Sequence, residues 1–99
     1  MQMRIVWGKV LSGKWDEYEA AFKQALAERG AVKGLHNQWL VRDQSDLDAG
    51  FSISLFESDA DMHAFWNSAA REKAMARLQS FYVNQYTVTH CDVKFAVNG

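Results

Sequence analysis

The stretch LHNQWLVRDQSDLDAGFSISLFES (residues 35–58) holds two strand-like segments on either side of a polar loop. Residues 35–42 and 50–57 are rich in β-branched and aromatic side chains, whereas residues 43–49 (DQSDLDA) are mostly polar, so the pattern predicts an antiparallel hairpin. Ser58 then stands where a helix N-cap is expected, and Asp61 follows three residues later in place of the usual Glu. The stretch therefore predicts two strands followed by a helix.

The flanking segments complete an alternating order of strands and helices. Residues 3–11 (MRIVWGKVL) read as a strand that ends at Ser12 and Gly13. Apolar residues at helical spacing predict one helix over 15–29 and a second, about five turns long, from Ser58 to Leu78. A last strand is expected over 86–97. The order β-α-β-β-α-β predicts one α+β domain over residues 1–99, a ferredoxin-like sandwich with a four-stranded antiparallel sheet and two helices on one face.

Both faces of this sheet carry apolar side chains. In the first strand Ile5 and Trp7 point one way, whereas Val6 and Val10 point the other. Two helices cover only one face, and an uncovered sheet bearing tryptophan and valine would be a large adhesive patch. We therefore expect a homodimer in which a second copy of the chain packs sheet against sheet.

Composition excludes several classes of partner. The 99 residues have a formal net charge of −1, which offers no electrostatic attraction to nucleic acid or to an anionic membrane. The first apolar run is far shorter than the roughly 20 residues that span a bilayer, and it lacks the pattern of a signal peptide. The one cysteine, Cys91, has no partner for an internal disulfide, which agrees with a reducing compartment. A cytoplasmic location is expected.

Two stretches of the sequence carry a resemblance that covers nearly the whole chain: SGKWDEYEAAF (12–22) and VKGLHNQWLVRDQSDLDAGFSISLFESDADMHAFWNS (32–68). With them the sequence resembles the antibiotic biosynthesis monooxygenase family of dimeric α/β-barrel proteins. Lys33 replaces the proline that is usual before Gly34. The residues that match the family pattern are Gly13, Lys14, Phe22, Gly34, Asp43, Phe56, Glu57, Ser58, Phe65 and Ser68. Most of them define turns, a helix cap and the core, so the resemblance implies the architecture more firmly than a reaction.

The resemblance implies a monooxygenase that works without metal or flavin on an aromatic or quinol-like molecule. Such a reaction needs an apolar cavity, a base and hydrogen-bond donors for an oxyanion. His63 and Asn67, four residues apart on the second helix, are the candidate catalytic pair. His36 or His90 could serve as the base instead, and Gln38 or Asn37 as the donor. The candidate walls for the substrate ring are Trp66, Trp7, Trp39 and Phe56.

Two other functions compete with this interpretation. A non-catalytic dimer that binds a small apolar ligand or a protein partner fits the same pattern, because the base is not fixed by any motif. Haem-degrading relatives carry an axial histidine about ten residues after a helix tryptophan, a spacing that leads from Trp66 to Ala76 here. No two histidines share a short ligand motif either. We expect no metal and no cofactor.

Overall fold

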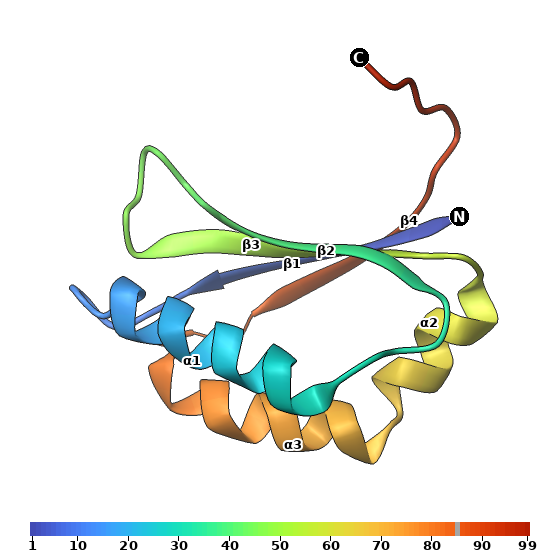
Figure 1. The fold of residues 1–99 in the computed structure, drawn as a ribbon. Helices are drawn as coiled ribbons and strands as arrows, with labels where there is room; N and C mark the ends of the chain where they lie inside the picture. The colour runs from blue at the N-terminus through green and yellow to red at the C-terminus, as the bar shows by residue number, and fades with distance from the viewer. Residues whose placement is uncertain (85) are drawn as a thin grey trace.

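The computed structural model describes residues 1–84 and 86–99, which form one four-stranded sheet with helices on one side (Figure 1). The strands are β1 (Gln2–Lys9), β2 (Leu35–Arg42), β3 (Ala49–Phe56) and β4 (Thr87–Asp92). The helices are α1 (Trp15–Arg29), α2 (Asp59–Trp66) and α3 (Ala69–Leu78), followed by a short 3₁₀ turn, η1 (Gln79–Phe81). The predicted hairpin and first helix are confirmed to within one residue at each end.

The sheet has the order β2-β3-β1-β4, and every neighbouring pair is antiparallel. The two central strands, β1 and β3, come from the two different halves of the chain, and each half adds one outer strand. This arrangement confirms the predicted ferredoxin-like fold.

The alternation of side chains in β1 gives the two faces different neighbours. Val6 is buried on the face that the helices cover, and its cross-strand partners are Ser52 on β3 and Val88 on β4. Trp7 lies on the opposite face, opposite Phe51, and no helix covers that face (Figure 1). We call this second face the open face; its apolar residues are Met3, Ile5, Trp7, Trp39, Val41, Phe51, Ile53 and Leu55.

The core lies between the sheet and the helices. At one end, Trp15, Tyr18 and Phe22 of α1 pack with Val10 and Leu78. The stripe that predicts the helix, with spacings of three and four, is therefore the face that is buried. At the other end, Phe56 and Met62 are almost completely buried, with 1% of each residue exposed.

The second helix differs from the prediction, because it is two helices and not one. The chain breaks at Asn67 and Ser68, and Ser68 begins α3 as its N-cap, with Oγ accepting a hydrogen bond from the Arg71 backbone N–H at 3.2 Å. Ser58 caps α2 in the same way, because its Oγ accepts from Asp61 N–H at 3.1 Å. The apolar periodicity predicted one continuous helix. Ser68 is a second N-cap within that pattern, and the chain starts a new helix there.

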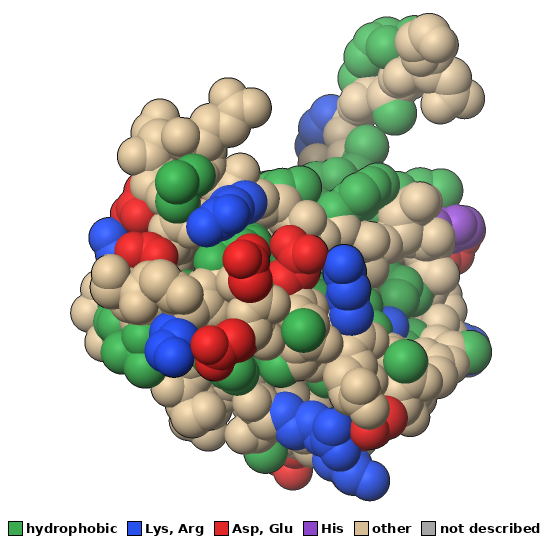
Figure 2. All heavy atoms as spheres, turned by 60° about the vertical axis from the view of Figure 1, so that its left-hand side comes forward, with side chains coloured by type: hydrophobic (Ala, Val, Ile, Leu, Met, Phe, Trp, Pro, Cys, Tyr) green, Lys and Arg blue, Asp and Glu red, His purple; other side chains and the backbone are tan. Residues whose placement is uncertain are grey.

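The last strand is shorter than predicted. It ends at Asp92, opposite Gln2, and the last backbone hydrogen bond runs from Val93 N–H to the Met1 carbonyl at 3.0 Å. Beyond that point residues 93–99 leave the sheet and stand clear of the body (Figures 1 and 2). Phe95 is 87% exposed as a result.

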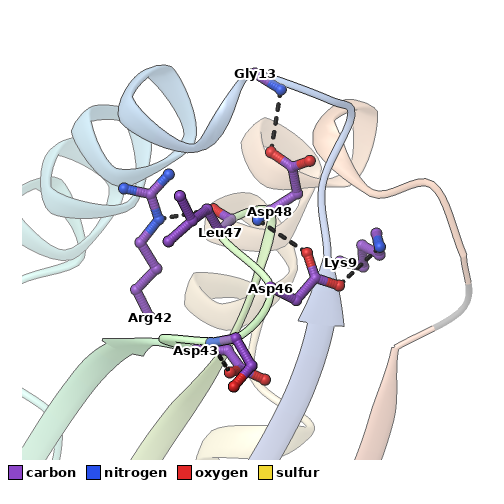
Figure 3. A network of polar contacts seen from close by, with 8 residues as sticks. Lys9, Gly13, Arg42, Asp43, Asp46, Leu47 and Asp48 are labelled. Carbon is purple, nitrogen blue, oxygen red and sulfur yellow. Dashed lines mark hydrogen bonds and ion pairs between the residues drawn. The ribbon is translucent and has the colours of Figure 1, made fainter.

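Acidic side chains organise the loop between β2 and β3 (Figure 3). Asp46 accepts hydrogen bonds from Lys9 Nζ at 2.7 Å and from Asp48 N–H at 3.2 Å. Asp48 in turn accepts from Gly13 N–H at 3.0 Å, so the loop is tied to the turn between β1 and α1. Asp46 is therefore a structural residue and not a freely exposed one.

No helix among residues 1–84 and 86–99 is both long and apolar enough to cross a membrane.

Candidate functional site

A small cavity lies between the helices and the covered face of the sheet. Its free volume is about 60 Å³, which is room for a few water molecules or for a functional group of similar size. Its lining combines apolar side chains of the core with polar side chains from strands and helices: Arg4, Val6, Phe22, Leu26, Arg29, Gln38, Ser52, Phe65, Arg71, Ala74, Met75, Leu78, Tyr82 and Tyr86. The small Ser52 on a central strand leaves the space that a larger residue would fill.

The indole ring of Trp66 lies between two arginines of this lining. The guanidinium carbon of Arg4 is 3.7 Å from the ring centroid, and that of Arg71 is 3.5 Å from it. Because α2 ends at Trp66 and α3 starts at Ala69, the break in the helix places Arg71 in the first turn of a new helix. Stacking on an aromatic face stabilises a guanidinium without neutralising its charge.

Three arginines of the cavity have no acidic partner. The Nε atoms of Arg4, Arg29 and Arg71 are buried without a hydrogen-bond partner, and no ion pair reaches these side chains within the described ranges. Burial and the nearby Arg71 charge lower the pKa of Arg4 to about 10, and burial also lowers the pKa of Arg29. Arginine side chains carry a positive charge at neutral pH, so the cavity is cationic.

Two tyrosine hydroxyls add hydrogen-bonding groups. Tyr86 Oη accepts a hydrogen bond from Arg71 Nη2 at 3.2 Å. Tyr82 Oη lies 2.9 Å from Tyr18 Oη, and burial raises the pKa of both phenols. Tyr18 and Tyr82 are therefore neutral at physiological pH, and each retains a proton for a hydrogen bond.

A wider groove adjoins the cavity. It has a free volume of about 300 Å³, at the lower end of the range of roughly 300–1,000 Å³ for ligand pockets. Arg29 and Phe65 line both spaces, so they form the boundary between them. The other residues of the groove are Ala31, Val32, Lys33, Asp61, Ala64, Ser68 and Ala70. An apolar body of a ligand fits the groove, and a small polar group fits the cavity.

The structure separates the predicted substrate walls. Trp66 stands beside the cavity through Arg4 and Arg71. Phe56 lies on the same side of the sheet, but it is a core residue, 1% exposed, whose ring packs 6.0 Å from that of Phe65. Trp7 and Trp39 lie on the open face, with the sheet between them and the cavity, so within one chain they do not share a pocket with Trp66.

The predicted catalytic pair lies at the surface. The side chain of His63 is 51% exposed, with Nε2 at 3.6 Å from an Asp59 oxygen and its ring 5.7 Å from that of His90. Asn67 is the exposed C-cap of α2. His36 is an exposed residue of β2 and contacts Glu57. None of these residues lines the cavity or the groove, and of the alternative donors only Gln38 does.

Sequence reasoning did not select the arginines, although one signal points to Arg4. Arg4 lies two residues before Val6, and both therefore belong to the face that the helices cover. A charged residue on a covered face is unusual and marks a candidate site. Within residues 1–84 and 86–99, no group of three or more His, Cys, Asp or Glu side chains is placed to hold a metal ion.

Comparison with known proteins gives the family and the fold. Residues 1–77 match the model of a family described as "Antibiotic biosynthesis monooxygenase". Two similar solved structures, described provisionally as antibiotic biosynthesis monooxygenases, come from Nitrosomonas europaea and Bordetella bronchiseptica. The first has 12% sequence identity and a TM-score of 0.82 over 96% of this chain and 100% of that chain. The second has 19% identity and a TM-score of 0.83 over 95% and 97%.

A conserved protein from Methanosarcina mazei Go1 has the same fold, with 12% identity and a TM-score of 0.81 over 95% of this chain and 94% of that chain. No curated protein matches the sequence.

Proposed function

Because the chain belongs to the antibiotic biosynthesis monooxygenase family, we propose that it is an oxygenase that oxidises an aromatic phenol or quinol-like molecule with molecular oxygen, without metal or flavin. The observation that carries this proposal is the cationic cavity. Arg4 and Arg71 lie on either side of Trp66 and have no acidic partner in the described chain.

The arginines supply what a phenol needs in order to react with oxygen. Oxygen reacts with the electron-rich phenolate and not with the neutral phenol. Two positive charges beside the hydroxyl favour its ionised form and so lower its pKa. Buried guanidinium N–H groups and a tyrosine hydroxyl can also donate hydrogen bonds to the oxyanion. The proton leaves to water, so the reaction requires no histidine in the cavity.

The proposed reaction needs no oxidant other than molecular oxygen. The phenolate gives an electron to oxygen, and the resulting radicals combine at a ring carbon that bears hydrogen. Breaking the O–O bond then leaves one oxygen atom on the ring as a quinone carbonyl. The second oxygen atom leaves as water with the ring hydrogen and the phenolic proton. The substrate is oxidised by four electrons, and these reduce one oxygen molecule completely.

The sizes of the two spaces suggest how the substrate lies. The cavity of about 60 Å³ accommodates the reacting oxygen, and the groove of about 300 Å³ accommodates the rest of the ring system against Phe65 and Val32. In this proposal Trp66 is a positioning residue, because its ring stacks on the guanidinium groups of Arg4 and Arg71. A role for His63 as the base or Asn67 as a donor requires substrate to reach the surface beside α2.

The functional unit that we propose is a homodimer. The open face carries Trp39 at 41% exposure and Val41 at 39%, among other apolar side chains. A second copy that packs on this face removes it from water. Trp7 and Trp39 then belong to the interface and not to the substrate pocket.

Oxygen uptake by the purified protein tests this function. A hydroxylated polycyclic aromatic should drive uptake in the presence of a chelator and without added flavin. Arg71→Gln should lower kcat/KM by about 10²–10³, the effect of removing one donor to an oxyanion. It should also move the rising limb of the pH profile to higher pH, because the phenol then ionises nearer its pKa in water.

Arg77→Gln is the matched control. Arg77 lies on the same helix but pairs with Glu28 at 2.6 Å and does not line the cavity, so this variant should keep full activity. Equal rates for the two variants, with folding intact by circular dichroism, would contradict the proposal. Binding of aromatics without oxygen uptake would favour the non-catalytic ligand-binding function. If His63→Ala lost activity while Arg71→Gln and Arg77→Gln kept it, the base would be His63.

A further inference from the structure

Arg29 occupies a position that the oxidation of a simple phenol does not require. It is the last residue of α1, and its side chain lines both the cavity and the groove. Its Nη1 donates to Gln38 Oε1 at 2.9 Å, whereas its Nε is buried and has no partner in the described chain. The guanidinium carbon lies 5.2 Å from the ring centroid of Phe65, where the groove meets the cavity.

The charges around the cavity exceed what one phenolate neutralises. Three arginines line it, and no Asp or Glu does. In the groove, Lys33 and Asp61 balance each other in formal charge and leave Arg29 as the excess. Partly buried cations without an acidic partner are costly to a protein, and an anionic ligand is one way to offset that cost.

We infer that the substrate of this site carries a carboxylate, which pairs with Arg29 at the boundary between cavity and groove while its phenol oxygen lies near Arg4 and Arg71. The inference rests on the function proposed above and specifies its substrate class as hydroxylated aromatic acids. A carboxylate is planar and matches the paired N–H groups of a guanidinium. Gln38 holds the Arg29 side chain by one Nη atom and leaves its other N–H groups for the ligand.

Binding measurements with three related probes test the assignment apart from catalysis. The probes are a hydroxynaphthoic acid, the corresponding carboxamide and the naphthol without either group, each titrated by calorimetry near pH 7. The wild-type protein should bind the acid at least about 10-fold more tightly than the carboxamide, because a charge-assisted hydrogen bond replaces a neutral one. In Arg29→Gln this preference should disappear, while the affinity for naphthol changes little.

Arg77→Gln controls for the general loss of a positive charge near α1, and it should keep the preference for the acid. Equal binding of acid and carboxamide by the wild-type protein would overturn the inference and leave the proposed oxygenase function standing. A preference that survives in Arg29→Gln but is lost in Arg71→Gln would overturn the assignment to Arg29. If none of the three probes bound, the result would contradict both this inference and the proposed function.

Discussion

Tyr82 lies directly against Gly8: a Cβ atom built on Gly8 would come within 2.7 Å of Cε1 of the Tyr82 ring. This glycine near the end of β1 therefore makes room for a tyrosine from the segment after α3. Tyr82 uses this room to reach Tyr18, with which it shares a hydrogen bond of 2.9 Å. The same tyrosine lines the cationic cavity, so the close approach at Gly8 also shapes the candidate site.

Gly8→Ala should destabilise the protein by about 1–3 kcal/mol, because the added methyl group overpacks against the tyrosine ring. Urea unfolding measures the change. The double variant Gly8→Ala/Tyr82→Leu provides the control, since it removes the ring that clashes. In that background the alanine should cost clearly less, and an unchanged cost would show that the contact is not the cause.

Ser68→Ala should cost about 0.5–2 kcal/mol, because Ser68 Oγ caps the first turn of α3 and also donates to the Phe65 carbonyl at 2.6 Å. Ser68→Gly should cost only a few tenths of a kcal/mol relative to the wild type, since glycine is tolerated at an N-cap. Thermal and urea unfolding of the two variants test the break between α2 and α3. Equal stability of Ser68→Ala and the wild type would mean that the helix does not depend on this cap.

Low pH should weaken the ion pair between Asp46 and Lys9. The hydrogen bonds from Lys9 and from the Asp48 backbone hold the pKa of Asp46 below its ordinary value of 3.8. A carboxyl whose pKa is lowered by folding adds stability above its unfolded pKa and loses it as the pH falls through the folded value. Asp46→Asn should therefore have a lower Tm than the wild type at pH 7, and the difference should close below pH 3.8.

Lys9→Met tests the same tie from its other end. The hydrogen bond and charge of Asp46 raise the pKa of Lys9, so the lysine contributes throughout the neutral range and loses this contribution only as the pH rises through that raised pKa. Its variant should show the same closing of the Tm difference in acid. A difference that persists in acid for both variants would assign their effect to something other than this ion pair.

Trp39→Glu should convert the proposed dimer to a monomer, because it places a charge on the open face. Light scattering at micromolar concentration should give twice the 11.3 kDa chain mass for the wild type and the chain mass for the variant. Leu47→Glu is the control, since Leu47 is 59% exposed in the loop between β2 and β3 and does not belong to the open face. A monomeric wild type, or dissociation by both variants equally, would contradict the interface.

The fold could be predicted from the sequence wherever residues at the end of a helix or strand mark where that element starts or stops. The polar loop of residues 43–49 and the cap at Ser58 are such signals, and the structure has a turn or a helix start at each. The break at Ser68 was missed because Ala69 and Ala70 continue a good helical composition after it. The end of β4 was missed for another reason: residues 93–97 alternate like a strand in sequence, but the structure pairs β4 with β1 only as far as Asp92, opposite Gln2.

The candidate site was harder to predict, because its parts meet only in three dimensions. Trp66 was selected for its ring, but its neighbours Arg4 and Arg71 are separated from each other by most of the chain. Histidines were chosen as candidate bases because a free imidazole titrates near neutral pH. The sequence does not show which side chains are buried, and in the structure His63 lies outside the cavity. Alternation along β1 carries the missing information, since it assigns Arg4 to the covered face.

That alternation has a consequence for how this sequence can change over evolutionary time. Arg4, on the cavity side, and Ile5, on the open face, are adjacent in the chain but serve different surfaces. Deleting or inserting one residue early in β1 would turn every later side chain of the strand over, moving Trp7 toward the helices and Val6 to the other side. Point substitutions can therefore adjust ligand and partner separately, whereas a change in the length of β1 would damage both at once.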